Sequence, residues 1–420
     1  MRPTRSLSIL LSAALLAALP LAPAAIAAEG RCRDYDPNRQ AYWGDLHVHT
    51  AVSMDANVFG TRLRPADAYR FARGEEVALG LAGDRPSQIE RPLDFAAITD
   101  HASNMGGVSL CQTPGSEVYD SKHCVAYRSP LDIAGKPPPE VVRLMRAKVD
   151  LGLDTPEVCG EDGARGDAAF AGVWHETQAA AAAANDDTPA CEFTSFVAYE
   201  YTATPNMTKL HRNVIFRDTD ALPQVPFTRF HSQNPEGLWD WMDGLRAKGV
   251  ESLAIPHNSN GSNGQMFKLV DWAGDPFDSA YSERRMRNEP LVEITQVKGT
   301  SETHPTLSDT DEWAGFEITP YRVATMLQSE PAGSYVRDAL RRGLGIESGG
   351  ITNPYRFGFV GASDTHTGAI SDDESNFFSK LGILDSTAEL RGSIPMGFVQ
   401  ATLTRFVAPD LVTEVDGQPY

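Results

Sequence analysis

The sequence predicts an α/β fold with a mainly parallel sheet, and it favours a (β/α) barrel. Three observations lead to this fold class. Seven apolar runs of β type recur along the chain, helix-like segments separate several of them, and polar residues stand where most of the runs end. Alternating strands and helices are typical of parallel sheets, and a barrel carries its chemistry at the carboxyl ends of its strands. An open doubly wound sheet stays an alternative, because it also binds ligands at strand ends.

The seven predicted strands are short apolar stretches. In chain order they are YWGDLHVHTAV, PLDFAAITDHA, TSFVAYEYTA, HRNVIFRD, ESLAIPHNSN, LVEITQVKG and FGFVGASDTHTG. Helices are predicted between several of these strands, at residues 65–79, 139–151, 167–184, 235–248 and 333–342.

Two long insertions interrupt this alternation. Residues 103–190 are rich in glycine, proline and cysteine, and residues 259–289 carry several aromatic side chains. Long loops over the mouth of a barrel usually build or cover its site. We therefore expect residues 29–420 to form one domain with both insertions over the C-terminal mouth; surface decoration is the alternative.

The amino terminus has the form of an export signal. A short basic start precedes an apolar stretch that ends in small residues, so residues 1–28 are predicted to be a Sec-type signal peptide cleaved near Ala27 or Ala28. The alternative is a membrane anchor, which the breaks at Pro20 and Pro23 disfavour. The mature protein is therefore expected to be periplasmic or secreted.

Charge restricts the class of partner. The chain has 420 residues and a formal net charge of −19. A surface of this sign repels phosphate backbones, so nucleic-acid binding over a broad face is not expected. A small anionic substrate is compatible with it at a site that holds cations, where the charge of the metal dominates. No stretch after the leader is long and apolar enough to span a bilayer, so no stable membrane anchor is expected.

Five cysteines agree with the oxidising compartment that an export signal implies. Cys111 with Cys124 and Cys159 with Cys191 could staple one loop region, which would leave Cys32 odd. The spacing alone does not fix the pairing.

The stretch DLHVHTAVSMDA, residues 45–56, predicts metal ligands on one face of a strand. Alternate residues of a strand share a face, so Asp45, His47 and His49 are expected to point the same way. Two imidazoles at this spacing can both reach one cation, and carboxylates complete the charge that a divalent metal needs. An isolated His-x-His pair is weak evidence, so the prediction depends on the other strand ends.

Candidate ligands recur at those strand ends. They are the Asp100-His101 pair after the second run, Glu200 after the third, the His257-Asn258 pair after the fifth, and Asp364 and His366 after the seventh, while His211 opens the fourth. Packing gives core histidines no reason to gather at strand ends, so this set predicts a common metal site. The remaining histidines lie in polar loops or on a helix and are interpreted as structural or solvated: His123, His175, His231 and His304.

Taken in order, these motifs resemble the PHP superfamily, named for its polymerase and histidinol phosphatase members. The stretches YWGDLHVHTAVSMDA, LDFAAITDHA and GASDTHTG are most similar to a secreted branch usually filed as a domain of unknown function. The similarity covers about residues 42–368 and is strongest at the motifs. It implies a distorted (β/α)7 TIM-like barrel that holds up to three metal ions at its C-terminal mouth.

The resemblance also implies three sets of metal ligands. The first set is His47, His49, Glu200 and Asp364. The second set is Glu200, His211 and His257. The third set is Asp55, His101 and His366. Asp55 stands where some members have a histidine, and His211 is assigned through the resemblance because it begins its run. Members of the branch commonly continue well past the last motif, whereas this sequence ends soon after it.

A mixed imidazole and carboxylate set suits two or three zinc, manganese or iron ions. Such ions lower the pKa of water to about 7 and hold the entering and leaving oxygens in a displacement at phosphorus. We therefore expect an exported metal-dependent hydrolase, preferably a phosphoesterase acting on a small phosphorylated substrate. Hydrolysis of an ester, amide or glycosidic bond is one alternative, and metal or ligand binding without turnover is another.

Other residues are candidates for supporting roles. Because ligand histidines cannot also act as free bases, Asp100 is the candidate for proton transfer, or for holding a ligand in place. Asn258, Arg212 and Lys298 are candidates for substrate binding, since each stands next to a motif or at a strand end; solvated charge is the alternative. Glu293 is either a further strand-end carboxylate or a packing group.

Overall fold

The computed structural model describes residues 32–79, 86–131, 138–149, 151–219, 221–322, 325 and 327–370, together with 402, 414–415 and 418–419. The predicted signal peptide, residues 1–28, lies outside them. Within the described segments, no helix is long and apolar enough to cross a membrane. The chain forms two compact units, Met1–Gln40 with Asp187–Cys191, and Ala41–Asp186 with Glu192–Tyr420.

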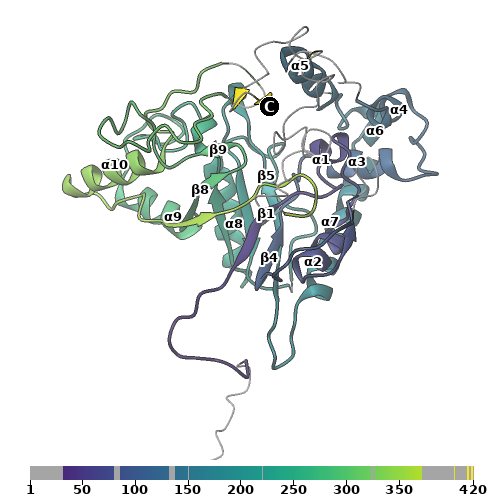
Figure 1. Cartoon of the computed structure of the whole chain (residues 1–420), viewed down its shortest axis with the longest axis horizontal. Coiled ribbons are helices and arrows are strands. Elements are labelled where there is room, and N and C mark those ends of the chain that lie inside the picture. Colours follow the sequence, from purple (N-terminus) through teal and green to yellow (C-terminus); the bar gives the residue numbers. More distant parts are fainter. Residues whose placement is uncertain are drawn as a thin grey trace, which may run out of the picture. The chain divides into compact units, whose positions relative to one another are not determined.

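A curled sheet of five strands lies at the centre of the larger unit (Figure 1). In spatial order the strands are β1 (Gly44–Val48), β4 (Phe95–Ile98), β5 (Thr194–Tyr201), β6 (Arg212–Phe216) and β7 (Ser252–Pro256). β1, β4 and β5 are parallel, whereas β6 is antiparallel to both β5 and β7. β7 therefore runs in the direction of β5, and β6 alone is reversed.

A smaller sheet follows in the sequence. Its order is β10 (Gly358–Gly361), β8 (Leu291–Gln296) and β9 (Gly299–Thr300), with β10 parallel to β8. The segment after β10 reaches the end of β1, where Val48 and Thr365 form an isolated parallel bridge. The remaining strands form two short antiparallel pairs, β2 (Val77–Ala78) with β3 (Pro86–Ser87) and β11 (Glu414–Val415) with β12 (Gln418–Pro419).

Helices occupy most of the connections between strands. The α-helices are α1 (Met54–Val58), α2 (Pro65–Ala72), α3 (Met105–Gln112), α4 (Lys122–Arg128), α5 (Pro138–Val149), α6 (Pro156–Cys159), α7 (Ala164–Ala184), α8 (Pro235–Arg246), α9 (Ser279–Asn288) and α10 (Val336–Ser348). Two 3-10 turns, η1 (Pro205–Met207) and η2 (Ser259–Gly261), follow β5 and β7. Each predicted helix is present, although α2 ends at Ala72 and α10 begins at Val336.

The predicted (β/α)7 barrel is wrong, even though each of the seven predicted runs forms a strand. The central sheet is a curled half-barrel of five strands, and the strands from the last two runs, β8 and β10, pair in a separate sheet. The main physical reason is the short link between β5 and β6, residues 202–211, which holds only a 3-10 turn. Parallel neighbours need a crossover of a dozen or more residues, so β6 has to pair antiparallel.

Alternate residues of the central strands pack into two different apolar layers. Ile98, Val197 and Phe216 are buried in the main core, which also contains apolar side chains of α2 and α7. Figure 1 shows these two helices beside β4 and β5. The intervening residues Ala97 and Ala198 belong to a second buried cluster with side chains of β6 and β7. This two-residue alternation fixes which side chains each strand presents.

The first insertion folds as a small unit of helices over α1. Its apolar cluster contains Val108, Tyr127 and Leu153 from the insertion and Met54 from α1. The Tyr127 hydroxyl donates to the Met54 carbonyl at 3.1 Å. The insertion therefore holds α1, from which Asp55 projects.

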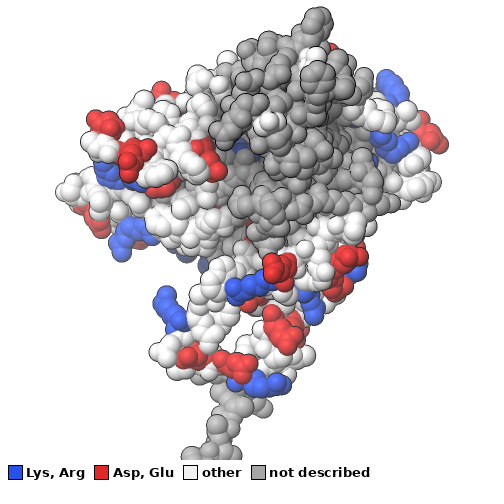
Figure 2. Space-filling view, in the orientation of Figure 1, with Lys and Arg blue, Asp and Glu red and all other residues white. Residues whose placement is uncertain are grey.

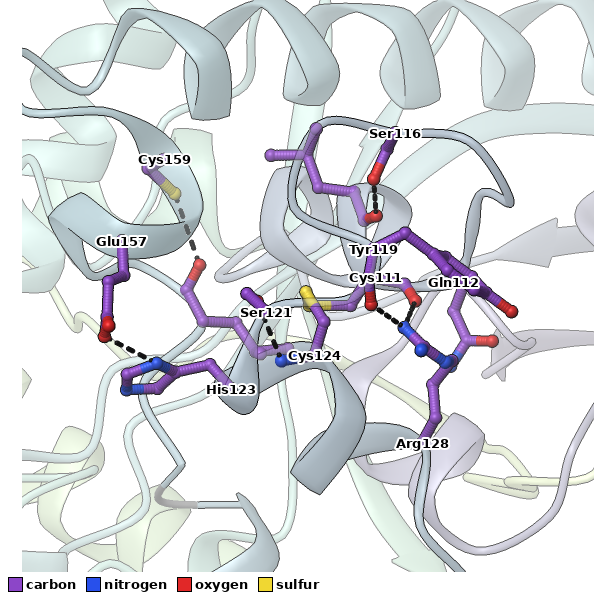
Figure 3. Close-up of a disulfide and its surroundings, with 12 residues drawn as sticks. Cys111, Gln112, Ser116, Tyr119, Ser121, His123, Cys124, Arg128, Glu157 and Cys159 are labelled. Atoms are coloured by element: carbon purple, nitrogen blue, oxygen red, sulfur yellow. Dashed lines mark hydrogen bonds and ion pairs between the residues drawn. A yellow bond between two sulfur atoms is a disulfide. The ribbon is translucent and has the colours of Figure 1, made fainter.

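The cysteine pairing was only partly predicted. Cys111 of α3 and Cys124 of α4 form the expected disulfide (Figure 3). The pairing of Cys159 with Cys191 is wrong, because Cys191 bonds to Cys32 within the smaller unit. Cys159 is a free thiol and donates to the Leu153 carbonyl at 3.2 Å.

Removing the disulfide in the insertion should measurably destabilise the protein. Replacing Cys111 and Cys124 by serine is expected to lower the free energy of unfolding by roughly 3 kcal/mol, as for a closed loop of about 15 residues. Urea denaturation measures this loss. Cys159→Ser is the matched control and should cost less than about 1 kcal/mol. Equal losses in the two variants would contradict a stabilising role for the disulfide.

Candidate metal centre

The reversed strand places its first residue at the edge where its neighbours end. Residue Tyr201 at the end of β5 pairs with Arg212, and Arg212 pairs with Pro256 at the end of β7. His211 and His257 therefore lie side by side just beyond these pairs. This arrangement explains why a candidate ligand opens the fourth run, whereas the others close theirs.

The ends of β1, β4 and β10 contribute the remaining candidates. His101, just beyond β4, forms an isolated parallel bridge with Glu200 near the end of β5. Beyond β10, Asp364 has a left-handed backbone with φ of 53°. Such a conformation costs an L-residue about 1–3 kcal/mol and is concentrated at functional sites. The backbone strain at Asp364 is therefore consistent with a functional role for its carboxylate.

All nine predicted ligands converge. Four groups have their nitrogen and carboxylate oxygen atoms within 4.8 Å of one another. They are His47 with His49 and Asp364, His47 with Glu200 and His257, His101 with Glu200 and His211, and His49 with His101 and His366. Asp55 joins the last group, with Oδ2 at 3.2 Å from His101 Nε2 and 3.0 Å from His366 Nε2.

The contacts of Glu200 relate these groups to the sets implied by the resemblance. His211 and His257 were expected on one cation with Glu200, and both face its Oε1. His211 also groups with His101, and His257 also groups with His47. Glu200 Oε2 faces His47 and His49 at 3.4 and 3.3 Å. Its Oε1 faces the other three histidines, at 2.6 Å from His211 Nδ1, 3.2 Å from His101 Nδ1 and 3.5 Å from His257 Nε2.

The buried atoms of this cluster fit metal ions. His47, His49, Glu200 and His257 are at most 1% exposed. The Nε2 atoms of the three histidines and Oε2 of Glu200 are buried and have no hydrogen-bond partner among the residues that the structure describes. A buried polar atom without a partner costs about 1–3 kcal/mol. A cation bound by these atoms would remove that cost.

The ionisation of the cluster also favours cation binding. Burial would raise the pKa of Glu200, but the neighbouring histidines, His101 first, hold it well below its usual range. Burial lowers the pKa of His47 well below its usual range and that of His257 to about 4. Metal ligands have to be ionised carboxylates or neutral imidazoles. The carboxylate of Glu200 and the imidazoles of His47 and His257 are therefore in the required form at neutral pH.

Hydrogen bonds on the second ring nitrogen orient several of the imidazoles. His47 Nδ1 lies 2.8 Å from Glu293 Oε2, and His49 Nδ1 lies 2.8 Å from the Ser53 hydroxyl. Similar contacts join His101 to Thr202, His211 to Thr204 and His366 to the carbonyl of Asp364. Such contacts fix ring orientation and tautomer in metal sites.

Ser53→Ala should weaken metal binding without removing a ligand. The Ser53 hydroxyl lies between His49 Nδ1 and Asp100 Oδ1, at 2.8 and 2.9 Å. Losing a group that orients a ligand typically costs 10–100-fold in metal affinity. Titration of the metal-free protein with zinc or manganese measures this change. Unchanged affinity would show that His49 does not need the contact.

Asp100 lies behind the loop after β1. Its carboxylate accepts hydrogen bonds from the amides and hydroxyls of both Thr50 and Ser53, at 2.6 to 3.2 Å. It reaches His49 only through Ser53. This position suits the ligand-holding role that the sequence offered as an alternative to proton transfer.

The three predicted substrate contacts have different positions. The guanidinium of Arg212 is buried in an ion pair with Glu289 at 2.9 Å. Lys298 forms an ion pair with Asp364, and Asn258 accepts a hydrogen bond from Lys209. Lys298 thus contacts a ligand of the cluster directly and is well placed for a role beside it.

Sequence reasoning missed Lys209 and left the role of Glu293 open. Lys209 is 2% exposed, and burial together with Lys298 lowers its pKa to about 7. Burial, and then Asp364, raise the pKa of Glu293 well above its usual range. The signal for Lys209 was its place two residues before His211, because extended residues at that spacing share a face.

Three of the other four histidines have local partners, and the fourth is exposed. His123 pairs with Glu157 at 2.7 Å, as Figure 3 shows, and His175 is exposed on α7. His231 and His304 contact nearby threonines. None of these histidines belongs to a potential metal-binding group among the described residues.

Charges alternate in sign on the described surface that Figure 2 shows. Acidic and basic side chains lie close to one another, and the described residues of this face form no broad basic area.

Together the fold and the site define a mixed α/β protein with a buried histidine and carboxylate cluster of metal-binding dimensions. The profile of the family described as "Protein of unknown function (DUF3604)" matches residues 36–408, so the chain belongs to this family. A search of curated proteins found no match.

Proposed function

We propose that this protein is an exported metal-dependent phosphoesterase, related to the PHP superfamily. Glu200 is the observation that carries the proposal. Its two carboxylate oxygens face different sets of histidines, so this side chain would help to hold two cations. Sites with two metals about 3.5–4 Å apart are typical of phosphatases and nucleases.

The donor set suits zinc, manganese or iron, two or three ions in number. Divalent ions in such a site lower the pKa of water to about 7 and neutralise charge on a transferring phosphoryl group. The reaction would consume one water and one phosphate ester and release an alcohol and a phosphate. The residues of this chain hold the cations and orient them, and Lys298 adds positive charge beside Asp364.

Positive side chains near the cluster support a phosphate ester over a neutral substrate. Lys298 pairs with Asp364, and the buried Lys209 interacts with Lys298, although the whole chain is strongly acidic. A buried cation costs free energy unless anions offset it. Carboxylates of the cluster provide part of that compensation, and an anionic substrate would add to it.

One coupled experiment tests the proposal. Metal content of the purified mature protein is measured, and turnover of phosphomonoesters, phosphodiesters and carboxylic esters is compared. We expect two or three bound ions per chain and turnover of phosphate esters. Turnover of carboxylic esters alone would overturn the preference for phosphate. Stoichiometric metal without any hydrolysis would instead indicate a binding protein.

A further inference from the structure

A cavity of about 390 Å³ opens beside the metal ligands. Asp55, His101 and His211 form part of its wall, so the cavity communicates with the cluster. Its size lies within the range of small-molecule sites, about 300–1,000 Å³. A substrate whose reacting group sits at the ligands would therefore extend its remaining part into this space.

Among the residues that the structure describes, Arg229 in the wall of the cavity has no anionic partner. Its Nε is buried and has no hydrogen-bond partner among them. The guanidinium instead lies 5.2 Å from the ring of Phe230. An unsatisfied charged donor costs more than a neutral one. An incoming anion would satisfy it.

Other buried or partly buried arginines of this unit show the contrast. Arg212 and Arg285 both pair with Glu289, and Arg246 pairs with Asp243 and Glu251. Each of these three arginines has a carboxylate partner. Arg229 has none among the described residues and lines the cavity instead.

The rest of the wall limits what the cavity can hold. Arg146 of α5 adds a second guanidinium, whose Nη2 lies 3.6 Å from the Met207 sulfur. Met54 and Met207 provide adaptable apolar surface. Asp154 is the acidic residue of the wall outside the metal ligands. The lining suits a compact organic group that carries a negative charge.

We propose that this cavity receives the leaving group of the substrate and that Arg229 binds an anionic group on it, either a carboxylate or a second phosphate. This inference rests on the proposed phosphoesterase function. Arg229 thereby determines specificity: the preferred substrates are phosphate esters whose alcohol portion is itself charged.

Three aryl phosphates test the inference on the metal-loaded protein. They are phenyl phosphate, 4-(carboxymethyl)phenyl phosphate and 1,4-phenylene bisphosphate. The wild type should have a lower KM for the two charged esters by about tenfold or more, as expected for a hydrogen bond to a charged group. Comparison of those two esters distinguishes carboxylate from phosphate recognition. Equal KM values for all three esters would overturn the inference and leave the proposed function intact.

Arg229→Gln should raise KM for the two esters with charged leaving groups about tenfold to a hundredfold, and by a much larger factor than for phenyl phosphate. Arg229→Lys should recover part of the loss. Arg287→Gln is the matched control, because Arg287 of α9 is paired with Asp243 of α8. An equal change in KM for phenyl phosphate and for the esters with charged leaving groups would contradict the role of Arg229.

Calorimetry provides a readout apart from turnover. The wild type should bind 4-hydroxyphenylacetate more tightly than Arg229→Gln does. This compound is the alcohol released from 4-(carboxymethyl)phenyl phosphate. Equal binding by the two proteins would overturn the inference. If no phosphate ester is turned over, the proposed function fails and the inference fails with it.

Discussion

His47→Ala and Asp364→Ala are each expected to remove bound metal and turnover together. His47 Nε2 lies 3.4 Å from Glu200 Oε2 and 3.2 Å from Asp364 Oδ1, so either change opens the same group of ligands. Loss of metal removes several kcal/mol of transition-state stabilisation. At 1.36 kcal/mol for each factor of ten, activity should fall by about a thousandfold or more. Metal content and kcat/KM on the best phosphate ester measure the two losses.

His175→Ala is the matched control for these variants. His175 is exposed on α7 and belongs to none of the ligand groups found among the described residues. This variant should retain both metal and turnover. A ligand variant that keeps full activity, with circular dichroism showing an unchanged fold, would contradict the assigned site.

The strands could be predicted from the sequence, but only part of their topology could. Each apolar run is long enough for one strand, and its composition is of β type whichever way the strand points. The direction of β6 depends instead on the length of residues 202–211, which is too short for a crossover. Counting that link would have predicted the reversal. The separation of β8 and β10 from the central sheet depends on packing between distant segments, and no local pattern reports it.

The positions of the strand ends predicted which side chains would lie together, even though the predicted barrel was wrong. Parallel strands in a barrel and in a curled half-barrel both collect their carboxyl ends at one edge, so the histidines meet in either case. His211 fits the same rule once β6 is reversed. Which cation each ligand would bind was harder to predict from the sequence. Glu200 faces five histidines, and the sequence holds no information on ring orientation.

Arg212 shows where proximity in sequence misled the prediction. Neighbouring residues of a strand point to opposite faces, so the side chain after His211 could not share its site. The same rule favoured Lys209, two residues before His211, which the prediction missed. Both outcomes follow from the two-residue alternation of side chains along a strand. The prediction applied this alternation to the site histidines and not to the residues beside them.

Removing bound metal with a chelator is expected to lower the melting temperature by roughly 10 °C. A cation present at about a thousand times its Kd stabilises the folded state by about 4 kcal/mol, and each kcal/mol shifts the melting temperature of a larger domain by about 2–4 °C. The physical reason is that several acidic side chains are buried close together at the site. Burial raises the pKa of Asp45 to about 6 and that of Glu293 well above its usual range, and the Asp364 carboxylate adds to both shifts.

Differential scanning fluorimetry with and without EDTA measures this shift. Adding zinc or manganese back should restore the original melting temperature, and the melting temperature of His47→Ala should not respond to EDTA because its cation is already lost. If EDTA strips the metal from the wild type while its melting temperature stays the same, the buried acids must be stable without cations. Their placement would then reflect packing, and the expected coupling between metal binding and stability would be wrong.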